Sequence, residues 1–176
     1  MSYSGGTAII KWKEECATMK TISYEQEQQA RELVAQSCIA LDTERFDDFL
    51  QLCLPEFNYR ATAYSPEIRR DMVWLEHDKP GMQELLKLIP RQNRDRTPIT
   101  RHFSIYSVGF VGVDLLKVDS MLQIYRTELD GGITSVFAIG KYHDILALDG
   151  GSVAGLLSRE VRLDTRMLGT GYHIPF

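Results

Sequence analysis

The side chains of this sequence that could bind a transition metal are four histidines and three cysteines. They are His77, His102, His143 and His173, together with Cys16, Cys38 and Cys53. An iron–sulfur cluster with two cysteine and two histidine ligands usually takes them from C-x-H and C-x-x-H pairs, and neither spacing occurs here. A mononuclear iron site needs two histidines and a carboxylate at one face, yet the histidines form no H-x-H or H-x-x-x-H pair. The sequence therefore predicts no metal ligands and no cofactor-binding residues in this chain.

Proton transfer by a side chain buried in an apolar cavity is the second chemistry to consider, because desolvation there shifts the pKa. The candidates are His102, Tyr59, His77 and Asp47. His102 follows Arg101 on an expected strand and could act as a general base if it faced such a cavity. The favoured alternative is a histidine hydrogen-bonded within the sheet or at a subunit contact. We therefore predict no catalytic residues.

Arginines gather in and beside the loop that follows the third expected helix. A guanidinium group suits interfaces because it binds carboxylates through two parallel hydrogen bonds, although a solvated loop is the alternative. The mixed charges of the last strand and the apolar side chains near residue 176 also suit a contact surface. The predicted subunit-interface residues are Arg91, Arg94, Arg96, Arg101, His102, Arg162, Tyr172 and Phe176.

Three helices are expected in the first half of the chain. Ser23 and Gln26 form an S-x-x-Q capping box, and apolar residues at helical spacing continue to Leu41. Asp42 or Thr43 should cap a short second helix that ends at Leu54-Pro55. A third helix should begin at Asp78-Lys79-Pro80 and stop at Pro90.

The strands are expected on both sides of the third helix, with most of them after it. Their ranges are Phe57–Ala63, Arg69–Glu76, Ile99–Val108, Lys117–Glu128, Ser135–Leu146 and Leu156–Met167. The segments Asp130-Gly131-Gly132 and Asp149-Gly150-Gly151 predict hairpins, since tight turns require the positive φ that glycine adopts. Helices first and an antiparallel meander second indicate an α+β fold. Alternation on the last strand places Arg159, Val161 and Leu163 on one face.

The length of 176 residues suits one domain, predicted over residues 23–176 with an N-terminal arm at 1–22. The arm either packs on a neighbouring subunit or folds back on its own domain. The net charge of −4 does not favour nucleic acid. The sequence offers neither a signal peptide nor a membrane span, which predicts a cytoplasmic protein. Cys38 and Cys53 fall on apolar helix faces and are expected to be reduced.

Four segments together resemble one known family. They are Arg45-Phe46-Asp47-Asp48-Phe49, Thr100-Arg101-His102-Phe103, the run VFAIGKYHDIL at 136–146 and the run VRLDTRMLGTGYHIPF at 161–176. They resemble the small (β) subunits of the Rieske-type aromatic-ring-hydroxylating oxygenases. The resemblance implies a cone in which a strongly curved antiparallel sheet wraps N-terminal helices, as in nuclear-transport-factor-like, scytalone-dehydratase-like and cystatin-like proteins.

The resemblance also implies a non-catalytic structural role in an α3β3 hydroxylase, where β chains form a trimer that holds the α subunits. The large α subunit would carry the Rieske [2Fe-2S] cluster and the mononuclear Fe(II). Electrons would come from NADH through a ferredoxin, a reductase or both. Substrates would be aromatic compounds or, as the closing run slightly favours, methanesulfonate in a monooxygenase. A free-standing cone-fold isomerase, dehydratase or small-ligand binder is the alternative, and an adaptor dimer is a third class.

Overall fold

The computed structural model describes residues 21–91, 96–168 and 174–176 of the chain. Three helices and a short 3-10 turn accompany six strands in the described part. The helices are α2 (Tyr24–Asp42), α3 (Phe46–Leu52) and α4 (Lys79–Leu88), and the turn is η1 (Ile89–Arg91). The strands are β1 (Cys53–Ser65), β2 (Arg70–Asp78), β3 (Ile99–Phe110), β4 (Leu115–Thr127), β5 (Thr134–Asp149) and β6 (Ser152–Leu163).

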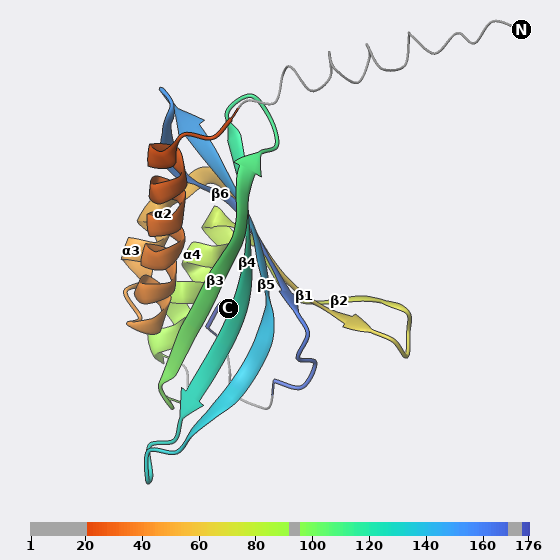
Figure 1. The fold of residues 1–176 in the computed structure, drawn as a ribbon. Helices are drawn as coiled ribbons and strands as arrows, with labels where there is room; N and C mark the ends of the chain where they lie inside the picture. The colour runs from red at the N-terminus through yellow and green to blue at the C-terminus, as the bar shows by residue number, and fades with distance from the viewer. Residues whose placement is uncertain (1–20, 92–95, 169–173) are drawn as a thin grey trace, which may run out of the picture.

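The six strands form one curved sheet in the order β2-β1-β6-β5-β4-β3, with the three helices on its concave face (Figure 1). Every neighbouring pair is antiparallel except β1 and β6, which run parallel. The α+β cone expected from the sequence is therefore present, with one parallel pair inside an otherwise antiparallel sheet. Side chains from the concave face and from the helices fill the space between the two layers as one hydrophobic core.

Helix α2 begins where the capping box predicts. The Ser23 hydroxyl accepts from the Gln26 N–H, and the Gln26 side chain accepts from the Ser23 N–H, both at 3.1 Å. The predicted cap of α3 is wrong. Asp42 is the last residue of α2, and Arg45 precedes α3 without a side-chain capping hydrogen bond to the helix backbone. The Asp42 carboxylate is instead bound by Arg101, as described below.

The prolines act differently at the two predicted helix boundaries. Pro55 does not end α3, because that helix stops at Leu52 and Pro55 already lies in β1. The register between β1 and β6 shifts between Cys53 and Asn58, so a residue without an N–H is tolerated there. Pro80 is the second residue of α4, where Asp78 caps the helix by accepting from the Gly81 N–H at 2.9 Å.

Both glycine turns form as expected. Gly131 and Gly132 join β4 to β5, Gly150 and Gly151 join β5 to β6, and all four have positive φ. The expected N-terminal arm lies outside the described residues apart from Thr21 and Ile22, and the Ile22 side chain packs against the hydrophobic core. None of the helices in the described ranges is both long and apolar enough to cross a membrane.

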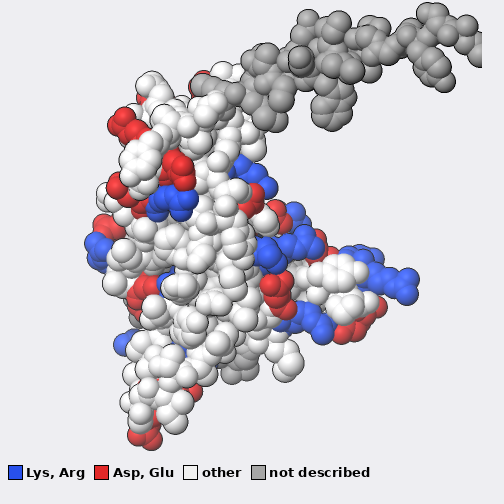
Figure 2. All heavy atoms as spheres, viewed as in Figure 1, with Lys and Arg blue, Asp and Glu red and all other residues white. Residues whose placement is uncertain are grey.

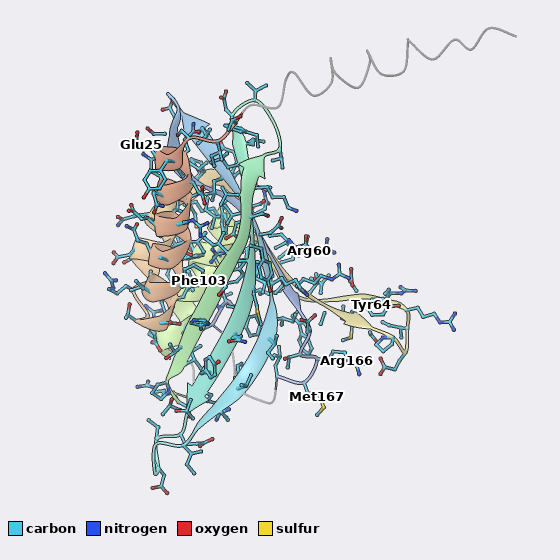
Figure 3. All side chains as sticks on the ribbon, in the orientation of Figure 1. Glu25, Arg60, Tyr64, Phe103, Arg166 and Met167 are labelled. Carbon is cyan, nitrogen blue, oxygen red and sulfur yellow. The ribbon has the colours of Figure 1, made fainter. Side chains whose placement is uncertain are left out.

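The β1–β2 hairpin extends away from the body of the molecule (Figure 1). Large apolar side chains remain exposed on it, among them Tyr64, Ile68, Val73 and Trp74, the last with 46% of its surface accessible. Figure 3 places Tyr64 on this extension and Arg60 close to its base. Exposed apolar side chains on a two-stranded ribbon that extends from the body of the protein are typical of a contact surface.

Candidate functional site

Arg101 points into the cone and joins three parts of the chain. Its side chain is on the concave face of β3, and the residue is only 5% exposed. The guanidinium binds the Asp42 carboxylate at the end of α2, and the Arg101 N–H donates to the same carboxylate at 2.9 Å. The guanidinium also donates to the carbonyl oxygen of Pro175. The arginine therefore links the end of α2, the edge strand β3 and the C-terminal residues.

Tyr59, on the concave face of β1, binds the backbone of the same C-terminal residues. The Phe176 N–H donates to the Tyr59 hydroxyl at 2.8 Å, and this hydroxyl donates to the Phe176 carbonyl oxygen at 3.2 Å. Ile174 and Phe176 are 6% and 5% exposed and belong to the hydrophobic core. Ile174–Phe176 therefore docks on its own domain.

A second buried ion pair lies deeper in the cone. Arg159 of β6 donates to both carboxylate oxygens of Asp144 on β5 at 2.8 Å, and both side chains are fully buried. The Arg159 guanidinium also lies 4.1 Å from the centre of the Tyr142 ring. Burial disfavours the charged arginine, but the Asp144 carboxylate more than offsets this and raises the pKa of Arg159 above its ordinary value. Arg159 and Asp144 therefore form an ion pair in which the opposite charges neutralise each other.

The other titratable groups beside this pair keep their protons at neutral pH. Burial raises the pKa of the Tyr142 hydroxyl and that of the Cys38 thiol. Burial also raises the pKa of Cys53 to about 12. Cys38 and Cys53 are free and buried, as the sequence predicts, although Cys53 begins β1 and does not lie on a helix face. The described interior thus offers protonated tyrosine and thiol groups and a closed ion pair, an arrangement that stabilises a fold and does not favour proton abstraction near neutral pH.

The structure brings together only two of the four acid–base candidates. Tyr59 and His77 are partners in the β1–β2 register, with Tyr59 buried and His77 half-buried. His102 follows the inward-facing Arg101 and is exposed on the opposite face of β3, while Asp47 is exposed on α3. In the described ranges, no three histidine, cysteine, aspartate or glutamate side chains form a group that could hold a metal ion.

The predicted interface residues occupy three kinds of position. Arg91, Arg96, His102 and Arg162 are exposed, and Arg162 lies 3.4 Å from Asp71. Arg101 and Phe176 are buried and have the partners described above within their own chain. Arg94 and Tyr172 lie outside the described residues. The contribution of these residues to a subunit interface stays a prediction.

The convex face of the sheet carries charges of both signs. On this face His143 and Lys117 contact Asp119 at 2.5 and 2.9 Å. Beyond the strands, Arg166 after β6 binds Glu67 in the β1–β2 turn at 2.6 Å. Burial disfavours the Asp119 carboxylate, but its hydrogen bonds with His143 and Lys117 prevail and lower its pKa below 3.8. Around the β1–β2 hairpin, Figure 2 shows basic and acidic side chains next to one another. This face is suited to a polar contact.

A hollow of about 400 Å³ opens between α3 and α4. Its walls include Phe46, Asp47 and Asp48 of the segment that contributed to the family resemblance, with Leu86 of α4 opposite. Arg45 at its rim binds Asp48 at 2.7 Å. Acidic, basic and apolar side chains together line this hollow, as in a surface recess that another side chain could enter.

Sequence reasoning missed the two buried ion pairs. Asp144 alternates with the inward-facing Tyr142 and Leu146, and Arg159 alternates with Val161 and Leu163. A charge of each sign on the apolar faces of two neighbouring strands was therefore a usable signal, because a buried charge requires a partner. No comparable local pattern marks Asp42 as the partner of a residue 59 positions away.

Two curated relatives are similar to the chain over most of its length. It is 35% identical over 153 residues to methanesulfonate monooxygenase hydroxylase subunit beta from Methylosulfonomonas methylovora, covering 82% of this chain and 84% of the relative. It is 33% identical over 135 residues to 2-aminobenzenesulfonate 2,3-dioxygenase subunit beta from an Alcaligenes species, covering 77% and 89%. No protein-family model matches the chain.

Solved structures share the fold. A Novosphingobium aromaticivorans protein assigned as the β subunit of an aromatic-ring-hydroxylating dioxygenase matches with a TM-score of 0.72 and 20% identity, covering 85% of this chain and 95% of that one. A chain of naphthalene 1,2-dioxygenase matches with a TM-score of 0.67 and 17% identity over 93% of both chains. A protein from N. aromaticivorans assigned as a scytalone dehydratase matches with a TM-score of 0.58 and 15% identity, covering 85% and 91%.

The curved sheet around helices defines the chain as a scytalone-dehydratase-like cone protein, and the predicted fold is confirmed. Within this fold class, the two curated relatives identify the family. The chain belongs to the β subunits of the Rieske-type ring-hydroxylating oxygenases. The predicted role as an oxygenase subunit is thereby confirmed and is preferred to the free-standing isomerase, dehydratase or ligand-binding protein.

Proposed function

We propose that this chain is the scaffold subunit of an α3β3 hydroxylase in the cytoplasm. In this assembly a trimer of the chain holds three α subunits at fixed separations. The α subunits carry the Rieske [2Fe-2S] cluster and the mononuclear Fe(II), and NADH supplies electrons through a reductase, with or without a ferredoxin. The similarity to the methanesulfonate monooxygenase β subunit over 82% of the chain carries the proposal.

The buried contacts inside the cone support a scaffold role. Arg159 and Asp144 neutralise each other, and the buried Ile174 and Phe176 occupy space between the sheet and the helices. A cone with substrate chemistry of its own needs an accessible apolar cavity that holds a titratable group. In the described part of this cone, the buried side chains of Arg159, Arg101 and Tyr59 bind other residues of the same chain.

The surface supplies two kinds of contact that an assembly of this type requires. A three-fold ring cannot be built from one self-complementary patch, so each chain must present two different patches to its neighbours. The β1–β2 hairpin, with Val73 and Trp74 exposed, is the proposed apolar contact. The exposed Arg91, Arg96, His102 and Arg162 are the proposed polar contacts, which set orientation more than affinity.

The substrate class follows from what the two curated relatives share. Their names specify methanesulfonate and 2-aminobenzenesulfonate, one aliphatic and one aromatic, and both are sulfonates. We therefore infer an organosulfonate as the substrate of the complex. The α subunit would bind the sulfonate, and this chain would set the position of that subunit.

Tagged purification from the native host tests the assembly. The expected result is co-purification of a larger chain with iron and acid-labile sulfide, in equal numbers with this chain, and organosulfonate-dependent oxidation of NADH once the reductase is added. A variant with Trp74→Arg should lower the yield of the large complex, whereas Tyr24→Arg, at an exposed position on α2, should not. Recovery of this chain alone, with activity of its own, would refute the proposal.

A further inference from the structure

The residues around Ile174–Phe176 have the properties of a peptide-binding site. Tyr59 and Arg101 between them engage three backbone groups of two consecutive residues, the Pro175 carbonyl and the Phe176 N–H and carbonyl. The partner in each case is a side chain from a distant part of the sequence. Side chains that read the backbone of an extended segment are characteristic of the recognition of a peptide, as distinct from strand pairing in a sheet.

Contacts outside these C-terminal residues also hold the receptor groups. The Asp42 carboxylate binds the Arg101 guanidinium and also accepts from the Arg101 N–H at 2.9 Å. Tyr59 is fixed within β1 by pairing with both β2 and β6. A site whose groups are positioned in advance loses little entropy on binding, so it can bind a short segment.

The side chains of the bound residues define the class of ligand. Ile174, Pro175 and Phe176 are all buried, and the first and last pack into the hydrophobic core. Burial of a phenylalanine and an isoleucine provides most of the driving force, while the three hydrogen bonds fix the direction of the segment. The proline limits the number of conformations that the free segment can adopt.

We infer that Tyr59, Arg101 and Asp42 form a binding site in the cone for an apolar peptide segment that contains an aromatic residue. Ile174–Phe176 is the resident ligand of this site. The segment is joined to Leu168 through five residues, so its local concentration at the site is high and the site is occupied in the intact chain. This inference depends only on the contacts of this chain and does not rest on the proposed oxygenase assembly.

The first test removes Ile174–Phe176 from the chain and supplies the same three residues as a free peptide. A variant that ends at His173 is expected to melt at a lower temperature than the full chain. Addition of the peptide acetyl-Ile-Pro-Phe should raise the melting temperature towards that of the full chain as its concentration increases. The control peptide acetyl-Ile-Pro-Ala should bind more than about tenfold more weakly, because it cannot bury the aromatic ring.

Matched tyrosine variants locate the site. In the shortened chain, Tyr59→Phe should lower the affinity for acetyl-Ile-Pro-Phe by about tenfold, since it removes one hydroxyl that both donates and accepts a hydrogen bond. Tyr64→Phe changes an exposed tyrosine on the same strand and should leave the affinity unchanged. A folded shortened chain that binds neither peptide, or binds both equally, would overturn the inference.

The full chain provides a second measurement if the shortened chain does not fold. Carboxypeptidase Y should remove the C-terminal residues of the Tyr59→Phe variant faster than those of the unmodified chain, because release of the segment precedes cleavage. The Tyr64→Phe variant should be trimmed at the unmodified rate. Equal trimming of all three proteins would show that Tyr59 does not retain the segment and would refute the site.

Discussion

Substitution of Asp144 by asparagine removes the counter-ion of a guanidinium group that has no access to water. Both side chains of the Arg159–Asp144 pair are fully buried, and two hydrogen bonds of 2.8 Å join them. Breaking a buried pair of this kind by removing one charge costs about 3–5 kcal/mol. For a domain of this size each kcal/mol lowers the melting temperature by about 2–4 °C, so we expect a decrease of about 6–20 °C.

Removal of both charges should have a much smaller effect. The double variant Asp144→Leu, Arg159→Met fills similar space and leaves no buried charge, and such replacements are often neutral or stabilising. It does lose the contact between the guanidinium and the Tyr142 ring, which lie 4.1 Å apart. A cation over an aromatic ring contributes up to about 2 kcal/mol when desolvated. The double variant should therefore be clearly more stable than Asp144→Asn.

Urea unfolding followed by circular dichroism measures these differences on the isolated chain. Asp164→Asn is the matched control, because Asp164 lies on the exposed face next to Lys141 at 3.5 Å, and such a pair contributes at most about 1 kcal/mol. A cost of less than about 1 kcal/mol for Asp144→Asn would contradict the expected role of the ion pair, because it is below the range for breaking a buried pair. A double variant as unstable as the single one would contradict it as well.

Three further outcomes follow from the described contacts. Cys38 and Cys53 should resist iodoacetamide in the native chain at about pH 8, because burial raises the pKa of both thiols, and mass mapping that finds either one modified before unfolding would contradict this. The Arg166 hydrogen bond lowers the pKa of Glu67 from 4.5 to about 2, so the stability from this pair is present above pH 4.5 and lost as the pH falls towards 2. Arg166→Gln should reduce this pH dependence and raise the pKa of Glu67, followed by carboxyl NMR, towards its ordinary value. His102→Ala should change the unfolding free energy of the isolated chain by less than about 0.5 kcal/mol because the side chain is exposed. The same variant should alter assembly with the α subunit more than it alters turnover. Chromatography measures the assembly, and an activity assay of the metal-loaded complex measures the turnover.

Local patterns were sufficient to predict most of the elements. The capping box at Ser23 fixes the start of α2 through contacts three residues apart, and Gly150 and Gly151 fix a turn by their own backbone preference. The alternation along β6 correctly separates the buried Val161 from the exposed Arg162. Each of these features depends on neighbours within one turn or one strand, which is the range over which sequence periodicity acts.

The interior contacts could not be predicted in the same way, because they join distant segments. Alternation places Arg101 on the same face of β3 as Ile99 and Phe103, but it does not indicate which group would neutralise an arginine on that face. The structure places Arg101 inside because Asp42, at the end of α2, neutralises it there. Tyr59 and Phe176 are 117 positions apart, and nothing near either residue indicates the other.

The parallel pairing of β1 with β6 sets an order for folding. Ala61 of β1 lies beside Val161 of β6. One edge of β1 can therefore pair only after the ribosome has added about a hundred further residues. At about 5–20 residues per second this delay is about 5–20 s, during which the β1 edge has no neighbour on that side. Long-range pairing of this kind raises the contact order and slows folding. The newly made chain therefore spends that time with an open strand edge, the state in which binding by a chaperone or aggregation is most favoured.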